Sequence, residues 1–175
     1  MLMTAAYFFG RKRAFVRADQ SGGLRTLHSR PTYYGALTAL WCGIPALLIF
    51  GFWLAFEPTV VTELVVAGLP PEIGSLSEDR LALILNDIRN LANGNITSST
   101  PSEAVQAAVA HYKGLQSTSK AALAVVVLAV AIISSIIVLR MINPQLRARN
   151  RVEQVVKIIL IASSTIAIFT TIGIV

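Results

Sequence analysis

Few side chains in this sequence belong to types that do chemistry, and their spacing matches no catalytic or ligand-binding motif. The two histidines, His28 and His111, are far apart in the chain, and the single cysteine, Cys42, lies inside an apolar run. One cysteine can form neither an intramolecular disulfide nor a thiolate metal cluster. The sequence contains no glycine-rich phosphate loop, no HExxH metal motif and no nucleophile elbow. We therefore predict no catalytic residue, no cofactor-binding residue and no metal ligand, and we expect a protein that is not an enzyme.

The elements that must position these residues are three long apolar runs, at residues 34–56, 121–139 and 155–175. Each is long enough to cross a hydrocarbon layer of about 30 Å as a helix that rises about 1.5 Å per residue. Composition agrees, because 54% of the residues are hydrophobic and only 14% are charged. We predict an all-α, multi-pass integral membrane protein, in which residues 1–9 form a further apolar segment too short to span. Because the basic residues crowd at the ends of the apolar runs, the net charge of +6 indicates membrane topology and not nucleic-acid binding.

Charge asymmetry between the connecting segments predicts the orientation of the spans. Residues 10–33 hold six lysines and arginines against one acid, and residues 140–157 hold five against one. Residues 57–120 hold four against seven acids. Since loops rich in lysine and arginine stay in the cytoplasm, we expect the basic loop 10–33 and the basic linker 140–154 to be cytoplasmic. The segment 57–120 is then periplasmic.

This orientation limits what the ionisable side chains can do together. His28 is cytoplasmic and His111 is periplasmic, so the two histidines cannot form one metal site or one acid–base pair. Lys157 lies near the cytoplasmic end of the third run, where its long side chain can extend its amine to the interface. An ionisable group deeper in a span would indicate an ion or proton path. We therefore expect no complete translocation path within this chain alone.

The periplasmic segment has the pattern of a small helical region. Residues 77–79, Ser-Glu-Asp, form a helix start, apolar residues then recur at helical spacing, and Gly94 supplies a stop. Residues 100–103, Thr-Pro-Ser-Glu, have the composition of a capping box at the start of a second helix. We expect this helix to run into the second span, with residues 114–119 as the candidate break. The apolar stretch 60–69, bounded by prolines, is expected to be a separate short helix or a surface segment.

Two stretches beside the apolar runs resemble a known family. Residues 27–35, Leu-His-Ser-Arg-Pro-Thr-Tyr-Tyr-Gly, lead into the first long run, and residues 149–157, Arg-Asn-Arg-Val-Glu-Gln-Val-Val-Lys, lead into the third. The first stretch resembles the N-terminal extension of a subset of bacterial phosphate-specific ABC transporter permeases, the PstC subunit. The second, with the serine- and threonine-rich run after it, resembles the start of that permease's core and its first core helix. The resemblance covers essentially the whole chain in order.

The resemblance implies a permease subunit of an ABC importer for inorganic phosphate in the bacterial inner membrane. The implied partners are the lipid bilayer, a second permease subunit within it, cytoplasmic ATPase subunits that hydrolyse ATP, and a periplasmic phosphate-binding protein. The cytoplasmic Glu-Ala-Ala coupling loop of such permeases and their later core helices do not occur in these 175 residues. The resemblance therefore implies the N-terminal part of a permease, which cannot transport phosphate alone, and it assigns no phosphate-binding residue.

Two other classes of function stay open on the sequence. A transmembrane sensor has a span, a periplasmic helical domain and a second span, and residues 140–146 resemble the start of a HAMP signalling linker. Against this class, the apolar run from residue 155 leaves no room for paired linker helices. The other alternative is a small membrane assembly or stabilising factor that acts as the whole 175 residues.

Overall fold

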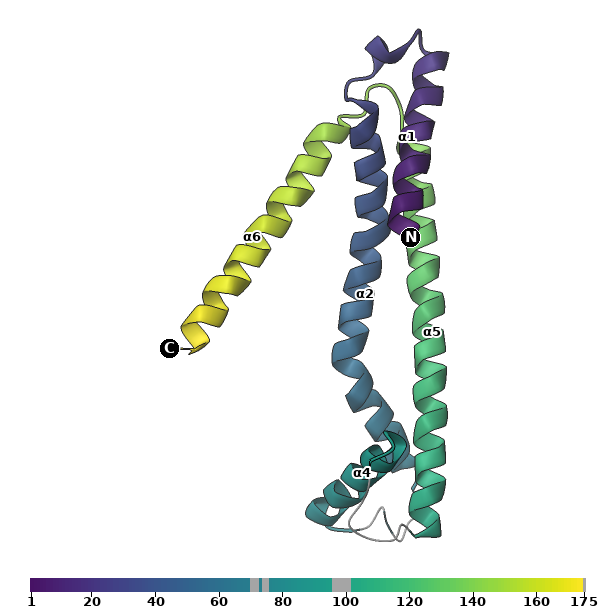
Figure 1. The fold of residues 1–175 in the computed structure, drawn as a ribbon, viewed down its shortest axis with the longest axis vertical. Coiled ribbons are helices and arrows are strands. Elements are labelled where there is room, and N and C mark those ends of the chain that lie inside the picture. The colour runs from purple at the N-terminus through teal and green to yellow at the C-terminus, as the bar shows by residue number, and fades with distance from the viewer. Residues whose placement is uncertain (70–72, 74–75, 96–101, 175) are drawn as a thin grey trace. The chain divides into compact units, whose positions relative to one another are not determined.

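The computed structural model describes residues 1–69, 73, 76–95 and 102–174. These described residues are mostly helical and include no strand, which confirms the predicted all-α class. Figure 1 shows the helices in chain order. Their bounds are α1 Leu2–Gln20, the short 3-10 helix η1 Leu24–Thr26, α2 Pro31–Ala67, α4 Glu78–Ala92, α5 Glu103–Met141 and α6 Ala148–Ile174.

Three of these helices, α2, α5 and α6, are long and apolar enough to cross a membrane. They contain the predicted runs 34–56 and 121–139 in full and residues 155–174 of the third run. Their hydroxyl side chains bond back to the same helix: the Ser134 hydroxyl donates to the Val130 carbonyl oxygen at 2.7 Å, and that of Thr170 donates to Ile166 at 2.7 Å. Such bonds satisfy the polar groups internally, as a lipid environment requires. The three helices thus support membrane insertion.

The chain forms two compact units. Unit 1 comprises residues 1–47 and 128–175, and unit 2 comprises residues 48–127. In the sequence of unit 1, eleven lysines and arginines stand against two acids, whereas unit 2 has four against seven acids. The excess of basic residues from which the orientation was predicted therefore belongs entirely to unit 1.

A stripe of small residues joins α1 to α2 within unit 1. Its four members, all buried and spaced four residues apart, are Ala6, Gly10, Ala14 and Ala18. A Cβ atom at Gly10 would lie 2.8 Å from the carbonyl oxygen of Tyr34, closer than van der Waals contact allows. A Cβ atom at Gly35 of α2 would likewise lie 2.8 Å from the carbonyl oxygen of Tyr7. The two backbones are therefore in direct contact, as in small-xxx-small pairs of membrane helices.

The first helix extends past the predicted end of the short apolar segment at residue 9. Residues 10–20 belong to α1, although they were predicted as part of a loop, because no proline or turn residue interrupts them. The helix stops where Gly22 and Gly23 adopt φ values of +98° and +106°, a region that favours glycine. The Gly23 N–H then donates to the carbonyl oxygen of Ala18 at 2.8 Å, which closes the helix end. The loop had been predicted from its many basic residues. Such residues indicate the side of the membrane but carry no information about backbone conformation.

Two further expectations about helix ends are corrected. The stretch 60–69 is not a separate segment, because α2 continues through Pro58 to Ala67. The missing proline N–H costs one backbone hydrogen bond, but the next turns bury Val61 and Val65 in the core of unit 2. Helix α5 has no break at residues 114–119 and runs unbroken from Glu103 to Met141.

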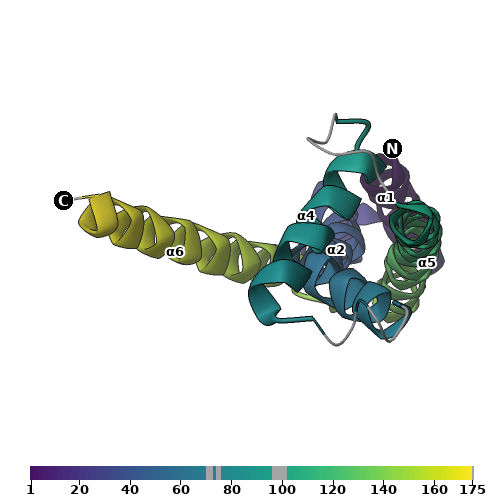
Figure 2. The ribbon, with the colours of Figure 1, turned by 90° about the horizontal axis from the view of Figure 1, so that it is seen from below.

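In unit 2, α4 packs against the adjacent turns of α2 and α5. Figure 2 shows α4 crossing the end of α2. The core residues of this contact are Val61, Val65, Ile88 and Ala108. As predicted, α4 follows Ser77 and ends before Gly94, which has a φ of +81°.

The start of α5 lies slightly later than the predicted capping box. Thr100 and Pro101 are outside the described residues. The helix begins at Glu103, and the Ser102 Oγ accepts a hydrogen bond from the Val105 N–H at 3.4 Å. Ser102 therefore takes the capping position.

Candidate functional site at the junction of the basic loops

The two basic connecting segments meet in unit 1, in a region that we call the loop junction, formed by residues 27–35 and 143–153. The His28 N–H donates to the carbonyl oxygen of Pro144 at 2.8 Å. The Tyr34 hydroxyl donates to the carbonyl oxygen of Leu146 at 3.0 Å. These bonds fix the start of α2 to the connection between α5 and α6.

An apolar core lies under the loop junction. Tyr34 and Leu37 of α2 pack in one buried cluster with Val138 of α5, with Ile142 and with Ala148 at the start of α6. Tyr34 is 0% exposed, so its hydroxyl depends on protein acceptors for its hydrogen bond. Burial of a large side chain contributes about 1.5–3 kcal/mol. The loop junction is therefore a packed joint between three helices and not a pair of hydrated loops.

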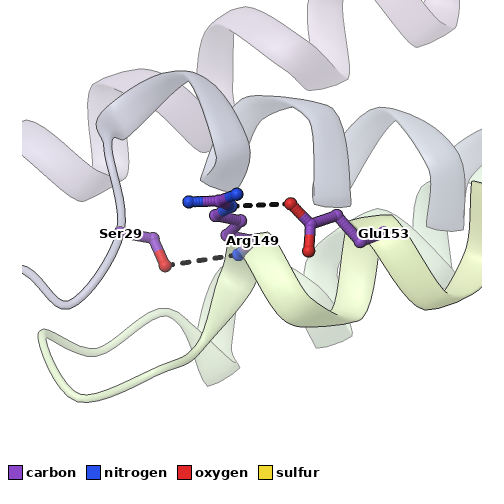
Figure 3. Close-up of polar contacts among 3 residues, drawn as sticks. All are labelled: Ser29, Arg149 and Glu153. Atoms are coloured by element: carbon purple, nitrogen blue, oxygen red, sulfur yellow. Dashed lines mark hydrogen bonds and ion pairs between the residues drawn. The ribbon is translucent and has the colours of Figure 1, made fainter.

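The first turn of α6 is held by a side chain from the other basic segment. The Arg149 backbone N–H, one of the free donors at the start of α6, donates to the Ser29 Oγ at 3.2 Å. Figure 3 shows this contact beside the ion pair within α6, in which Arg149 Nε lies 2.6 Å from Glu153 Oε1. Both charged side chains are more than half exposed, so water screens the pair and it contributes little to stability. Ser29, which is 7% exposed, is the more specific of the two contacts.

The structure puts the reactive side chains singled out in the sequence at separate points. His28 contributes its main chain to the loop junction, whereas His111 lies in unit 2, with its Nε2 3.3 Å from a Cβ placed at Gly68. Cys42 is buried on α2, and Lys157 is exposed on α6. Across the described residues, no group of three or more histidines, cysteines or acids could hold a metal ion. What the loop junction itself can do is hold three helices in a fixed relation.

A polar chain in unit 2 was missed by the sequence analysis. The indole N–H of Trp53 donates to the Ser119 Oγ at 3.0 Å, and the Ser119 hydroxyl donates to Glu57 Oε1 at 3.0 Å. All three side chains are partly buried, and they join α2 to α5. A tryptophan and a glutamate one turn apart at the end of an apolar run were visible in the sequence. Their partner could not be identified from the sequence, because residues 117–119 all carry hydroxyls and each of them is an equivalent candidate.

Residues 1–170 match the sequence profile of a family described as phosphate ATP-binding cassette transporter. The chain belongs to this family. The match includes both halves of the loop junction and nearly all of the three apolar helices. No curated protein sequence and no solved structure matches the chain. The predicted relation to phosphate ABC transporters is thus confirmed at the level of the family.

In this member of the family, the loop junction unites the two stretches that carried the resemblance. Ser29 and Tyr34 belong to residues 27–35, and Arg149 and Glu153 belong to residues 149–157. The two stretches are separated by more than 100 residues, yet the Ser29 Oγ and the Arg149 N–H are hydrogen-bonded. The two stretches therefore contact each other directly within unit 1.

Replacing Ser29 with alanine should weaken the attachment of α6. The change leaves the Arg149 N–H without its acceptor, which is expected to cost about 0.5–2 kcal/mol, as for other lost helix caps. Thermal unfolding of the purified protein in detergent measures the loss. Ser21→Ala, an exposed serine in the same basic segment, is the matched control. Equal unfolding temperatures for the two variants would show that Ser29 does not hold α6.

Proposed function

We propose that this chain is the N-terminal part of the permease subunit, of the PstC type, of an ABC importer for inorganic phosphate in the bacterial inner membrane. The observation that carries the proposal is the family match over residues 1–170, which spans the loop junction and the apolar helices. ATP is hydrolysed by separate cytoplasmic subunits, and this chain is not an enzyme. The segment 57–120 faces the periplasm, and the loop junction faces the cytoplasm.

The surface of α6 supports a place within a larger helical assembly. Every residue from Val156 to Gly173 is exposed, so this helix has no neighbour along most of its length within the described chain. The Thr165 hydroxyl donates to the Ile161 carbonyl oxygen at 2.8 Å and is satisfied within the helix. The serines at 163 and 164 have no such bond among the described residues, and hydroxyls of this kind link helices within membranes. A second permease subunit and further core helices would supply the missing neighbours.

The basic excess of unit 1 supports the orientation, because lysines and arginines beside spans are retained in the cytoplasm. In that orientation the periplasmic phosphate-binding protein docks on the side of unit 2, and the ATPase subunits dock on the side of the loop junction. The family match does not favour a sensor, because it describes a transporter over nearly the whole chain. An assembly factor would belong to the same family, but it would act as a polypeptide separate from the permease.

Phosphate uptake in a bacterium that carries the gene tests the proposal. Deletion of the gene should abolish most ATP-dependent uptake of radiolabelled phosphate at low external phosphate, and sulfate uptake should not change. Proteoliposomes that contain the 175-residue chain alone should not accumulate phosphate. Unchanged phosphate uptake in the deletion strain would contradict the proposal. Full restoration by these 175 residues, expressed apart from the remaining permease helices, would instead identify an assembly factor.

A further inference from the structure

A groove with a basic rim lies between α1 and α5 in unit 1. Its volume is about 380 Å³, and its basic residues are Lys12 and Arg13 of α1 and Arg140 of α5. Its floor is apolar and includes Phe9 and Leu139. The residues on each helix recur at helical spacing, so the groove follows the line along which the two helices pack.

The apolar floor continues along the same two helices, away from the basic rim. A second groove of about 240 Å³ shares Phe9 and Leu139 with the first. It extends past Leu2 on α1 and Ile132 on α5, and its lining is almost entirely apolar. Together the two grooves have cations at the end near the loop junction and hydrocarbon toward the middle of the apolar helices. This is the distribution of polarity that a membrane phospholipid has along its length.

The basic rim has no acidic partner within the described residues. Lys12, Arg13 and Arg140 make no hydrogen bond and no ion pair there, and all three are exposed. One turn after Arg13, the Nε of Arg17 is buried and also lacks an acceptor. Unit 1 contains only two acids, and one of them, Glu153, is paired with Arg149. The groove therefore presents positive charge that an anionic ligand can neutralise.

We propose that this groove binds an anionic phospholipid of the inner leaflet, with its phosphate at Lys12, Arg13 and Arg140 and an acyl chain along Phe9 and Leu139. Basic pockets between membrane helices on the cytoplasmic side bind anionic head groups in this way. The bound lipid would fill the apolar gap between α1 and α5 and would neutralise the basic rim. The inner-leaflet assignment rests on the proposed orientation, whereas the binding itself does not depend on phosphate transport.

Native mass spectrometry of the detergent-purified chain with added phosphatidylglycerol or phosphatidylcholine tests the binding. The wild-type chain should retain phosphatidylglycerol in preference to phosphatidylcholine. Removal of each cation, in Lys12→Gln, Arg13→Gln and Arg140→Gln, should weaken phosphatidylglycerol binding by roughly fivefold, because one basic residue near an anionic surface contributes about 1 kcal/mol. The double variant Arg25→Gln with Arg147→Gln removes two exposed cations outside the groove and should leave binding unchanged.

Circular dichroism of each variant establishes that it is folded, and Lys12→Arg and Arg140→Lys, which keep the charge, should bind as the wild type does. Equal retention of the two lipids by the wild-type chain would overturn the proposal. A loss in the control double variant as large as in the groove variants would also overturn it, since the binding would then follow net charge alone. Displacement of phosphatidylglycerol by millimolar inorganic phosphate would identify a site for the free anion instead.

Discussion

Replacing Gly10 with leucine is expected to separate α1 from α2 and to destabilise unit 1 strongly. A Cβ atom at this position already meets the carbonyl oxygen of Tyr34 at 2.8 Å and the side chain of Thr38, which is fully buried. A backbone carbonyl inside a helix cannot move aside cheaply, so the two helices themselves must shift. Gly10→Ala should cost about 1–3 kcal/mol, as overpacked core sites do, and Gly10→Leu should cost more.

Gly51 supplies the matched control for this variant. Like Gly10 it lies inside a helix, in this case α2, but a Cβ atom there would meet nothing within 4 Å. Gly51→Leu should therefore be neutral or slightly stabilising, because leucine favours a helix more than glycine does by roughly 0.5–1 kcal/mol. Thermal unfolding in detergent, followed by circular dichroism, compares the two. If Gly10→Leu unfolds at the same temperature as Gly51→Leu, α1 does not pack on α2 through the small-residue stripe.

Truncation of Tyr34 to alanine is expected to open the loop junction. The tyrosine side chain is fully buried in the cluster that joins α2, α5 and α6, so its loss leaves a cavity that should cost about 3–5 kcal/mol. Tyr34→Phe keeps the ring and removes only the hydroxyl that donates to Leu146. That milder change should cost about 0.5–1.5 kcal/mol, the net contribution of one hydrogen bond, because the Leu146 carbonyl oxygen still accepts from the Ala148 N–H at 2.8 Å.

The neighbouring Tyr33 is the control for both variants. It packs at the edge of the same cluster, and its hydroxyl makes no hydrogen bond within the described residues. Urea unfolding of the three variants in detergent should rank their losses as Tyr34→Ala, then Tyr34→Phe, then Tyr33→Phe. A loss for Tyr33→Phe as large as that for Tyr34→Phe would show that the bond to Leu146 does not hold the loop junction.

The long apolar helices were predictable from the sequence because their signal is local. Each of the runs 34–56, 121–139 and 155–175 has the length and hydropathy of a span by itself, and each lies in a helix that could cross a membrane. The start of α4 after Ser77 was predictable from an equally local pattern, although the Ser77 side chain makes no capping hydrogen bond.

The candidate site was not predictable, because it depends on contacts between distant parts of the chain. The sequence identified residues 27–35 and 149–157 as recognisable stretches, but it did not show that Ser29 accepts a hydrogen bond from Arg149. The close approach at Gly10 was missed for a similar reason: a glycine after an apolar run suggests an end, and only the position of α2 shows that it is a contact. Likewise, the basic residues of the groove were assigned to two separate loops, 10–33 and 140–154, in the sequence analysis. The packing of α1 beside α5 brings them together.

The orientation of the basic segments is the claim on which the proposed transport role and the inner-leaflet lipid both rest. Single cysteines at Arg25, Asn95 and Arg147, all exposed positions, can be introduced after the buried Cys42 is replaced by alanine. Intact cells are then treated with a maleimide that cannot cross the inner membrane. We expect Asn95→Cys to be labelled in intact cells, and Arg25→Cys and Arg147→Cys to be labelled only after the inner membrane is permeabilised. Labelling of Arg25→Cys and Arg147→Cys in intact cells, with Asn95→Cys protected, would contradict this account.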